Sequence, residues 1–386
     1  MPVTTVTTGV QYSGKWTLQS QAQAVAAGTW TGIPFLYAWG LNNNGQLGLN
    51  NTTYYSSPNQ VGSLVTWSKI AMSDHTAAIK TDGTLWVWGR NNNGQLGLGN
   101  RTQYSSPKQV GALTNWSNVA CGNQVTIAVK TDGTLWTWGY GGVGQLGLNN
   151  LTYYSSPKQV GSLTNWSNVR FGQQFTVAIK TDGTLWAWGV NSAGQLGQNN
   201  TTNRSSPVQV GALTTWAQIS SGSYHCMAIK TDGTLWAWGT GGSGELGLGN
   251  TTNYSSPKQV GALTTWASVA GCNQYTAAIK TDGTLWTWGI NTTGQLGLGD
   301  RTNRSSPVQV GLLTAWLKVD GKSQGGAQFT ISTKTDGTLW AWGQNDYGQL
   351  GLGNRTNYSS PKQVGSLASW INIAAGTYST IAIKTT

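Results

Sequence analysis

The sequence predicts an all-β protein, a single seven-bladed β-propeller with four antiparallel strands in each blade. The main observation is a repeat of about 50 residues that contains Trp-Gly, four variable residues and then Gly-(Gln/Glu)-Leu-Gly. Its seven copies begin at Trp39, Trp88, Trp138, Trp188, Trp238, Trp288 and Trp342. A second tryptophan and a Ser-Ser-Pro motif also recur seven times each. Four short strands in each unit of this length are typical of a propeller.

Within one copy, residues 116–161, short apolar runs are separated by polar turns. The alternation predicts strands at residues 117–121, 126–130 and 134–138, and a fourth near 159–160. Asp132-Gly133 lies between the second and third strands, where glycine supplies the positive φ of a tight hairpin turn. No apolar stripe with a 3.6-residue period is present, which excludes helical repeats. Of the 22 tryptophans, 20 occupy repeat positions and are expected to fill the spaces between blades.

The order of the strands predicts how the ring closes. The first copy starts with a third strand at residues 35–39, whereas the chain ends with a first and a second strand at residues 370–384. Residues 370–384 must therefore pair with residues 35–62 to complete the seventh blade, which removes exposed sheet edges. The other blades are expected to start near residues 67, 116, 166, 216, 266 and 316. Residues 32–386 form the propeller in this interpretation, and residues 1–31 are a separate N-terminal segment.

The repeat carries a family resemblance. Asp-Gly-Thr-Leu-Trp-Thr-Trp-Gly at residues 132–139, followed by Gly-Gln-Leu-Gly at 144–147, resembles the repeat of the regulator of chromosome condensation family. The resemblance implies the seven-bladed propeller but not one function, because a single scaffold hosts many activities. The family's nucleotide-exchange activity needs a wedge-like insertion, whereas this chain has only four extra residues near 322–327. A basic chromatin-binding tail is also missing, since Lys15 is the only charged residue before Lys69.

The polar residues do not form a recognisable catalytic or metal-binding pattern. Six of the eleven acidic residues are turn aspartates, and the other five show no carboxylate pair or metal-ligand spacing. The two histidines occupy equivalent places in non-adjacent blades, and the three cysteines lie at non-equivalent positions without a Cys-X-X-Cys pair. The sequence therefore predicts a protein that is not an enzyme and has no metal and no cofactor.

The net charge of +11 allows two interpretations. One lysine recurs in each copy beside the turn, at Lys80, Lys130, Lys180, Lys230, Lys280, Lys334 and Lys384. These lysines could form a circle that meets phosphate groups or nucleic acid. Alternatively, each one flanks a turn and pairs loosely with the aspartate two residues later. We favour the second interpretation, because no cluster of basic residues or basic tail accompanies the circle. The sequence contains no run of 18 apolar residues, so it predicts no membrane span.

The connections between the first and second strands, and the residues after each Trp-Gly, differ between copies. In an up-and-down blade both connections emerge on the same face, and the uniform turns between the second and third strands emerge on the other. Varied loops on a rigid scaffold are a usual place for recognition, although neutral drift of surface loops is the alternative. The predicted partner-binding face consists of Asp74, His75, Arg90, Asn123, Gln124, Tyr140, Gln173, Gln174, Phe175, Tyr224, His225, Asn273, Gln274, Tyr275, Gln324, Asp346, Tyr347 and Tyr378.

Residues 1–31 lie outside the repeat and resemble anchor segments in structural proteins of environmental tailed phages. Apolar residues alternate with polar ones there, as in a strand that buries one face. We predict an attachment segment based on Tyr12, Trp16, Leu18 and Trp30. The start of the chain has neither the basic residues nor the apolar stretch of a secretory signal. The expected location is therefore a virion or an extracellular surface assembly, with the cytoplasm as the alternative.

Three classes of function stay open from the sequence. The favoured one is a virion or surface-assembly protein that docks through residues 1–31 and recognises a partner through its varied face. Its protein partner would be a particle or assembly subunit, or a protein or glycan of a host surface. The second is a free protein- or carbohydrate-binding propeller, similar to an inhibitor or a lectin. The third is a nucleic-acid or phosphate binder that uses the lysine circle.

Overall fold

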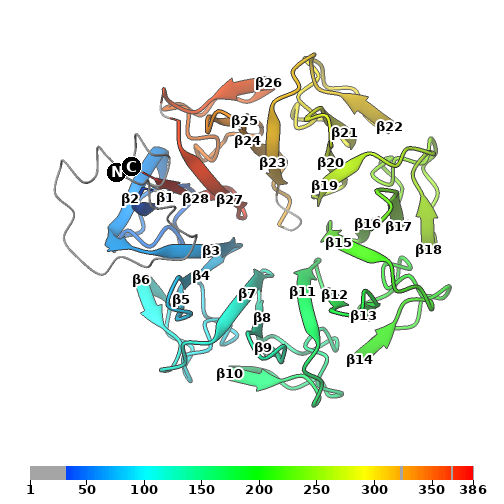
Figure 1. The fold of residues 1–386 in the computed structure, drawn as a ribbon. Helices are drawn as coiled ribbons and strands as arrows, with labels where there is room; N and C mark the ends of the chain where they lie inside the picture. Colours follow the sequence, from blue (N-terminus) through cyan, green and yellow to red (C-terminus); the bar gives the residue numbers. More distant parts are fainter. Residues whose placement is uncertain (1–31, 322–324, 367, 386) are drawn as a thin grey trace, which may run out of the picture.

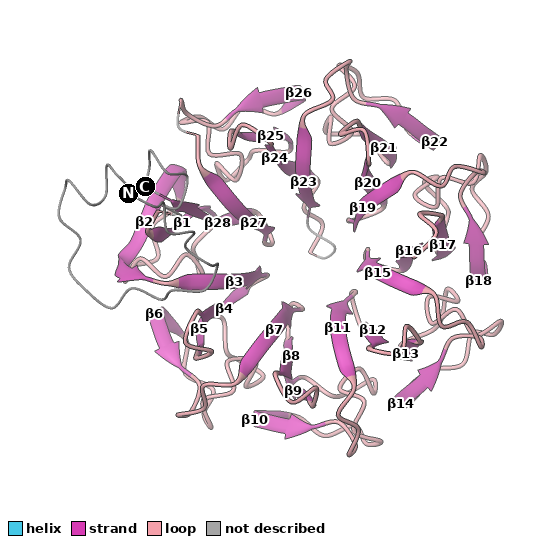
Figure 2. Ribbon diagram, in the orientation of Figure 1, coloured by secondary structure: helices cyan, strands magenta, loops and turns pink. Residues whose placement is uncertain are grey.

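The computed structural model describes residues 32–321, 325–366 and 368–385. All regular elements in these ranges are strands, and they form seven four-stranded sheets around a central axis (Figures 1 and 2). The predicted seven-bladed propeller with antiparallel blades is therefore confirmed. None of the described residues belongs to a helix long and apolar enough to cross a membrane.

Each blade places one strand at the axis and three strands successively further out. The innermost strands are β3 (Trp67–Met72), β7 (Trp116–Cys121), β11 (Trp166–Phe171), β15 (Trp216–Ser221), β19 (Trp266–Gly271), β23 (Trp316–Gly321) and β27 (Trp370–Ala375). The second strands are β4 (His75–Lys80), β8 (Val125–Lys130), β12 (Phe175–Lys180), β16 (His225–Lys230), β20 (Tyr275–Lys280), β24 (Phe329–Lys334) and β28 (Ser379–Thr385). The third strands are β5 (Leu85–Gly89), β9 (Leu135–Gly139), β13 (Leu185–Gly189), β17 (Leu235–Gly239), β21 (Leu285–Gly289), β25 (Leu339–Gly343) and β1 (Pro34–Gly40). The outer strands are β6 (Tyr104–Gln109), β10 (Tyr154–Gln159), β14 (Arg204–Gln209), β18 (Tyr254–Gln259), β22 (Arg304–Gln309), β26 (Tyr358–Gln363) and β2 (Tyr55–Val65).

The outer strand differs from its prediction. It was expected near residues 159–160, but β10 begins at Tyr154 and includes the Ser-Ser-Pro motif. Tyr154 pairs with Gly139, and the register then shifts before Lys158 pairs with Thr137. Pro157 is accommodated because an outer strand has one unpaired edge, where the missing N–H is not needed.

The seventh blade joins the two ends of the described chain. Its strand order is β2-β1-β28-β27, and β1 pairs with β28 from Pro34 opposite Thr385 to Gly40 opposite Ser379. The predicted closure is confirmed. Because the outer pair and the inner pair come from opposite ends of the chain, the blade can form only when the whole ring is in place.

The Trp-Gly and Gly-Gln-Leu-Gly motifs work together between blades. The indole N–H of Trp138 donates to the carbonyl of Gln95 in the preceding blade, over 2.9 Å. All seven blade junctions repeat this bond, through Trp39–Gln349, Trp88–Gln46, Trp138–Gln95, Trp188–Gln145, Trp238–Gln195, Trp288–Glu245 and Trp342–Gln295. Gly97 has φ +70°, and a Cβ there would lie 2.7 Å from the Trp138 indole nitrogen. The glycine is therefore needed for the close approach of the two blades.

The turn between the second and third strands is stabilised by its aspartate. The Asp132 carboxylate accepts hydrogen bonds from the Thr134 N–H and hydroxyl, and the Trp136 indole donates to the same hydroxyl. The two bonds from Thr134 hold the pKa of Asp132 below its ordinary value. The repeated aspartates thus act in turns.

Candidate functional site

The two faces of the ring carry different connections between strands. In the second blade, the N–H of Tyr140, which follows the third strand, donates to the carbonyl of Gln124, which precedes the second strand. The connections that vary between copies therefore lie together, on a surface that we name the varied face. On the other side, the Trp116 N–H donates to Gly83 in the preceding blade's turn, so the linkers between blades accompany the uniform turns. We name that side the turn face.

Five residues predicted for the partner-binding face are buried, and that assignment is wrong for them. They are His75, Phe175, His225, Asn273 and Tyr275. All but Asn273 are the first residues of second strands, and side-chain alternation turns them inward between blades. The His75 ring lies 2.7 Å from the Thr126 hydroxyl of the next blade, and the Tyr275 hydroxyl donates to the Phe329 carbonyl over 2.6 Å. These contacts join neighbouring blades, and burial keeps the five side chains from the surface.

The other described residues of the predicted face are at least partly accessible. They are Asp74, Arg90, Asn123, Gln124, Tyr140, Gln173, Gln174, Tyr224, Gln274, Asp346, Tyr347 and Tyr378. Asp74 and Arg90 form an ion pair with an N–O distance of 3.0 Å within the first blade. The predicted residues Gln324, Tyr12, Trp16, Leu18 and Trp30 lie outside the described residues.

Three tyrosines gather where the sixth and seventh blades meet, and we name them the tyrosine cluster. The ring centroids of Tyr347 and Tyr378 are 5.0 Å apart, and those of Tyr54 and Tyr347 are 5.9 Å apart. Tyr347 follows β25, Tyr378 lies between β27 and β28, and Tyr54 precedes β2. The sequence analysis assigned Tyr347 and Tyr378 to the partner-binding face but did not include Tyr54.

A signal for Tyr54 exists in the repeat. The position before the outer strand is asparagine in four copies, at Asn203, Asn253, Asn303 and Asn357. Each of these side chains accepts a hydrogen bond from a backbone N–H twelve residues earlier. Tyr54 and Tyr153 replace this structural asparagine, and both contact another tyrosine, since the Tyr140 and Tyr153 centroids are 4.7 Å apart. Loss of a repeated hydrogen bond therefore coincides with gain of an accessible aromatic contact.

The backbone of Tyr378 is also unusual. Its φ is +56°, in the left-handed region that bulky residues seldom adopt. Such a conformation costs on the order of 1–3 kcal/mol and is frequent at functional sites. Partial burial, together with Tyr347 and Asp346 nearby, raises the pKa of the Tyr378 phenol. The phenol is therefore neutral at physiological pH and able to donate a hydrogen bond.

The lysine circle packs against the indole rings of the turn face. The Lys180 ammonium lies 3.7 Å from the Trp186 ring centroid and 4.8 Å from that of Trp166. The same arrangement recurs at Lys80, Lys130, Lys230, Lys280 and Lys334. Burial lowers the pKa of Lys180, and the field of Asp182 opposes this shift. These six lysines thus bind tryptophans in their own blade, a role closer to the turn-flanking interpretation than to a phosphate-binding circle.

The described residues offer little for acid–base or metal chemistry. They contain no group of three His, Cys, Asp or Glu side chains that could hold a metal ion. The three cysteines are buried, and burial lowers the pKa of His225 to about 3, so its ring stays neutral.

Comparisons with known proteins agree with this fold. Residues 153–386 match the RCC1-like domain, and residues 35–79, 82–129 and 116–145 match the regulator of chromosome condensation (RCC1) repeat. Human WBSCR16 is similar with a TM-score of 0.82 and 19% identity, over 92% of this chain and 99% of that chain. Prp20p from Saccharomyces cerevisiae, in a study of its binding to Gsp1p and histones, has a TM-score of 0.79 and 18% identity, over 92% of both chains. Yeast RCC1 (Prp20) bound to Kap60 has a TM-score of 0.80 and 18% identity, over 99% of this chain and 96% of that chain. This chain belongs to the family of RCC1-like propellers.

Proposed function

We propose that this protein is a non-catalytic binding propeller that holds a protein partner on its varied face. The observation that carries the proposal is the tyrosine cluster of Tyr54, Tyr347 and Tyr378. It lies where the copies of the repeat diverge, whereas six blades repeat one lysine–tryptophan arrangement on the turn face.

Tyrosine suits this role for physical reasons. A phenol ring supplies a large contact area with few rotatable bonds, so little conformational entropy is lost when it is held at an interface. Tyr347 contacts both Tyr54 and Tyr378, and these contacts restrict the rings before a partner arrives. Aromatic side chains that are already restricted are the usual dominant contributors to interface energy.

The similar yeast protein supports the class of partner. Prp20p is characterised for its binding to Gsp1p and histones, and a second structure shows it with Kap60. A propeller of this fold thus serves as a platform for other proteins. At 18% identity the likeness extends to the fold, and the partner of this chain is expected to be its own.

We further propose that the partner is a subunit of a virion or another extracellular surface assembly. This proposal rests on the sequence of residues 1–31, where Tyr12, Trp16, Leu18 and Trp30 are the expected attachment residues. Tryptophan side chains are costly to leave in water, so a segment with two of them favours contact with another protein.

Site-specific photo-crosslinking tests the binding face. A photoreactive phenylalanine analogue at position 347 is expected to capture one defined protein in the native source, and Tyr378→Ala is expected to reduce that capture severalfold. The matched control places the same analogue at Leu163, which is 46% exposed on the turn face. Capture of the same protein from position 163 but not from 347 would show that we assign the wrong face.

Removal of residues 1–30 tests the assembly role separately. The variant is expected to melt at the temperature of the full chain and to be lost from purified particles, as measured by calorimetry and peptide counting. A lower melting temperature with normal incorporation would show that the segment stabilises its own propeller, and the assembly role would then be wrong.

A further inference from the structure

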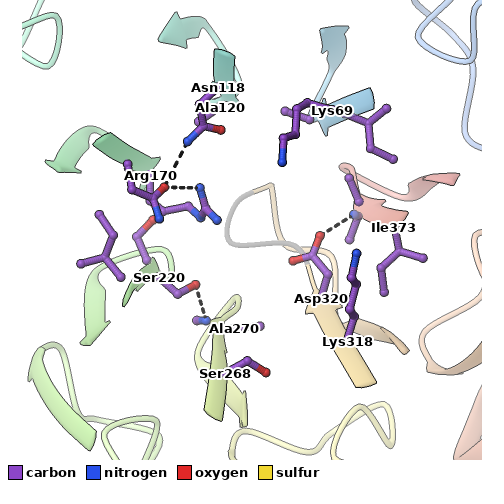
Figure 3. A pocket seen from close by; sticks show the side chains of 18 of the residues that line it. Lys69, Asn118, Ala120, Arg170, Ser220, Ser268, Ala270, Lys318, Asp320 and Ile373 are labelled. Carbon is purple, nitrogen blue, oxygen red and sulfur yellow. Dashed lines mark hydrogen bonds between the residues drawn. The ribbon is translucent and has the colours of Figure 1, made fainter. Parts of the chain in front are cut away.

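The seven innermost strands enclose a central channel with a volume of about 720 Å³ (Figure 3). Strand alternation turns the third and the fifth residue of each innermost strand toward this channel. Most third residues carry an amide or hydroxyl group, and most fifth residues are alanine. The channel therefore has a polar layer and, one step closer to the varied face, a layer of small side chains.

Three basic residues depart from this pattern. Lys69 and Lys318 occupy third positions in the first and sixth blades, and Arg170 occupies the fifth position in the third blade. Figure 3 shows Lys69 and Arg170 extending into the channel from two sides and Lys318 lying along the channel wall toward the seventh blade. The fifth-position Asp320 adds one carboxylate, so the described lining has a net charge of +2.

Lys318 and Arg170 use only part of their hydrogen-bonding capacity on neighbours. The Lys318 ammonium donates to the Ile371 carbonyl over 2.6 Å. One guanidinium nitrogen of Arg170 donates to the Asn168 side chain and the Val169 carbonyl, both over 2.9 Å. Asp320 accepts the Ala375 N–H over 2.9 Å. An ammonium group has three donors and a guanidinium has five, so further donors are available to a ligand.

The positive charges also disfavour each other. Removal from solvent, and next the charge of Lys69, lower the pKa of Lys318. Desolvation lowers the pKa of Arg170, and the field of Asp320 opposes that shift. Two cations coupled within a confined space gain energy from an anion that contacts both of them.

We propose that the central channel binds a small multivalent oxyanion, with phosphate or carboxylate groups, between Lys69 and Lys318. Arg170 supplies further positive potential from the opposite wall. The volume of about 720 Å³ lies within the range of small-molecule sites and exceeds the need of a single phosphate ion. This site is independent of the varied face, and its ligand is a small molecule rather than a protein.

Calorimetric titration of the full chain with tripolyphosphate and with citrate tests this site. Binding of one equivalent is expected, and raising the salt concentration is expected to weaken it by screening. The double variant Lys69→Met and Lys318→Met should bind at least about tenfold more weakly, because it removes both cations that are proposed to contact the anion. The control double variant Lys158→Met and Lys258→Met, on outer strands, should bind within about twofold of the parent.

The outcomes separate the possibilities. Binding of tripolyphosphate alone identifies a phosphate site, and binding of both probes identifies a general oxyanion site. Absence of one-equivalent binding by either probe at millimolar concentration would overturn the proposal. Equal weakening in the outer-strand control would overturn it too, since the effect would then follow net charge. Melting curves of all variants are recorded so that loss of binding is not confused with loss of structure.

Discussion

The turn face and the varied face are built by the same seven copies of one repeat, yet they differ in how strictly the repeat is kept. On the turn face, six blades place a lysine over two tryptophans, and the nearer ammonium-to-centroid distance is 3.6–4.3 Å in all six. On the varied face, the first blade has an ion pair, the second has a tyrosine pair, and the sixth and seventh share the tyrosine cluster. Positions that are the same in every blade therefore take part in packing, whereas positions that differ between blades carry accessible charged or aromatic side chains.

Divergence alone does not identify a functional residue. His75, Phe175, His225 and Tyr275 also differ between copies, but their side chains lie between blades. The direction of the side chain separates these residues from Tyr54 or Tyr224. A residue that differs and is accessible is a candidate for binding, whereas one that differs and is buried adjusts the packing of one blade junction.

The largest effect is expected from breaking the ring itself. Deletion of residues 370–386 removes β27 and β28, and β1 then loses the partner that it pairs with along its whole length. Both the strict and the varied face depend on that blade, so we expect aggregation or loss of the cooperative melting transition. Circular dichroism and size-exclusion chromatography measure this. A truncated chain that stays monomeric and melts like the parent would contradict the closure model.

Two tyrosines at varied positions of adjacent blades, Tyr275 and Tyr224, test the distinction between buried and accessible divergence. Tyr275→Ala removes a fully buried ring and its hydrogen bond to Phe329, and is expected to lower the free energy of unfolding by about 3–5 kcal/mol. Tyr224→Ala, at a half-buried loop position, should change it by less than about 1 kcal/mol. Urea denaturation measures both. Equal effects would mean that side-chain direction does not separate the two classes.

One departure from the strict repeat predicts a pH dependence. Glu245 replaces the glutamine of the other six copies, and burial raises its pKa to about 7. The folded state therefore keeps a proton that the unfolded state releases near pH 4.5, and stability falls as the pH rises from about 4.5 to 7. Glu245→Gln should remove this dependence and raise the free energy of unfolding above pH 7 by up to about 3 kcal/mol. Identical pH profiles of parent and variant would show that the buried carboxylate is not destabilising.

The smallest effect concerns the lysines of the turn face. Lys180→Met keeps the aliphatic packing but removes the charge over Trp166 and Trp186. We expect it to lower the free energy of unfolding by about 1 kcal/mol. Lys384→Met is the matched control. In the seventh blade Tyr37 stands at the third-strand position that Trp186 occupies in the third blade, so this variant should lower the free energy of unfolding by less. Thermal melting compares the two. A Lys180→Met variant that is as stable as the parent would show that the charge of the repeated lysine over the indole rings does not stabilise the fold.

Much of the fold could be predicted from the sequence, because the information is local and repeated seven times. The turn at Asp132-Gly133, the strands beside it and the pairing of both chain ends follow from the order of short motifs. The start of the outer strand at Tyr154 could not be predicted in this way, since Pro157 is acceptable only on a strand with a free edge. The candidate site was predicted in part: Tyr347 and Tyr378 were assigned to one face, but Tyr54 was missed and Tyr275 was misplaced.

The sequence by itself determined the number of blades, the closure of the ring and the division into a strict and a varied face, because each depends on the period and order of the motifs. Only the tertiary structure decided which varied side chains reach solvent, since one step along a strand turns a side chain from the loop into the blade junction. It also decided that the repeated lysines lie on indole rings and that Lys69, Arg170 and Lys318 share one channel. The lysine–indole contacts depend on side-chain direction within one blade, whereas the channel residues come from three different blades and meet only because the blades pack around one axis.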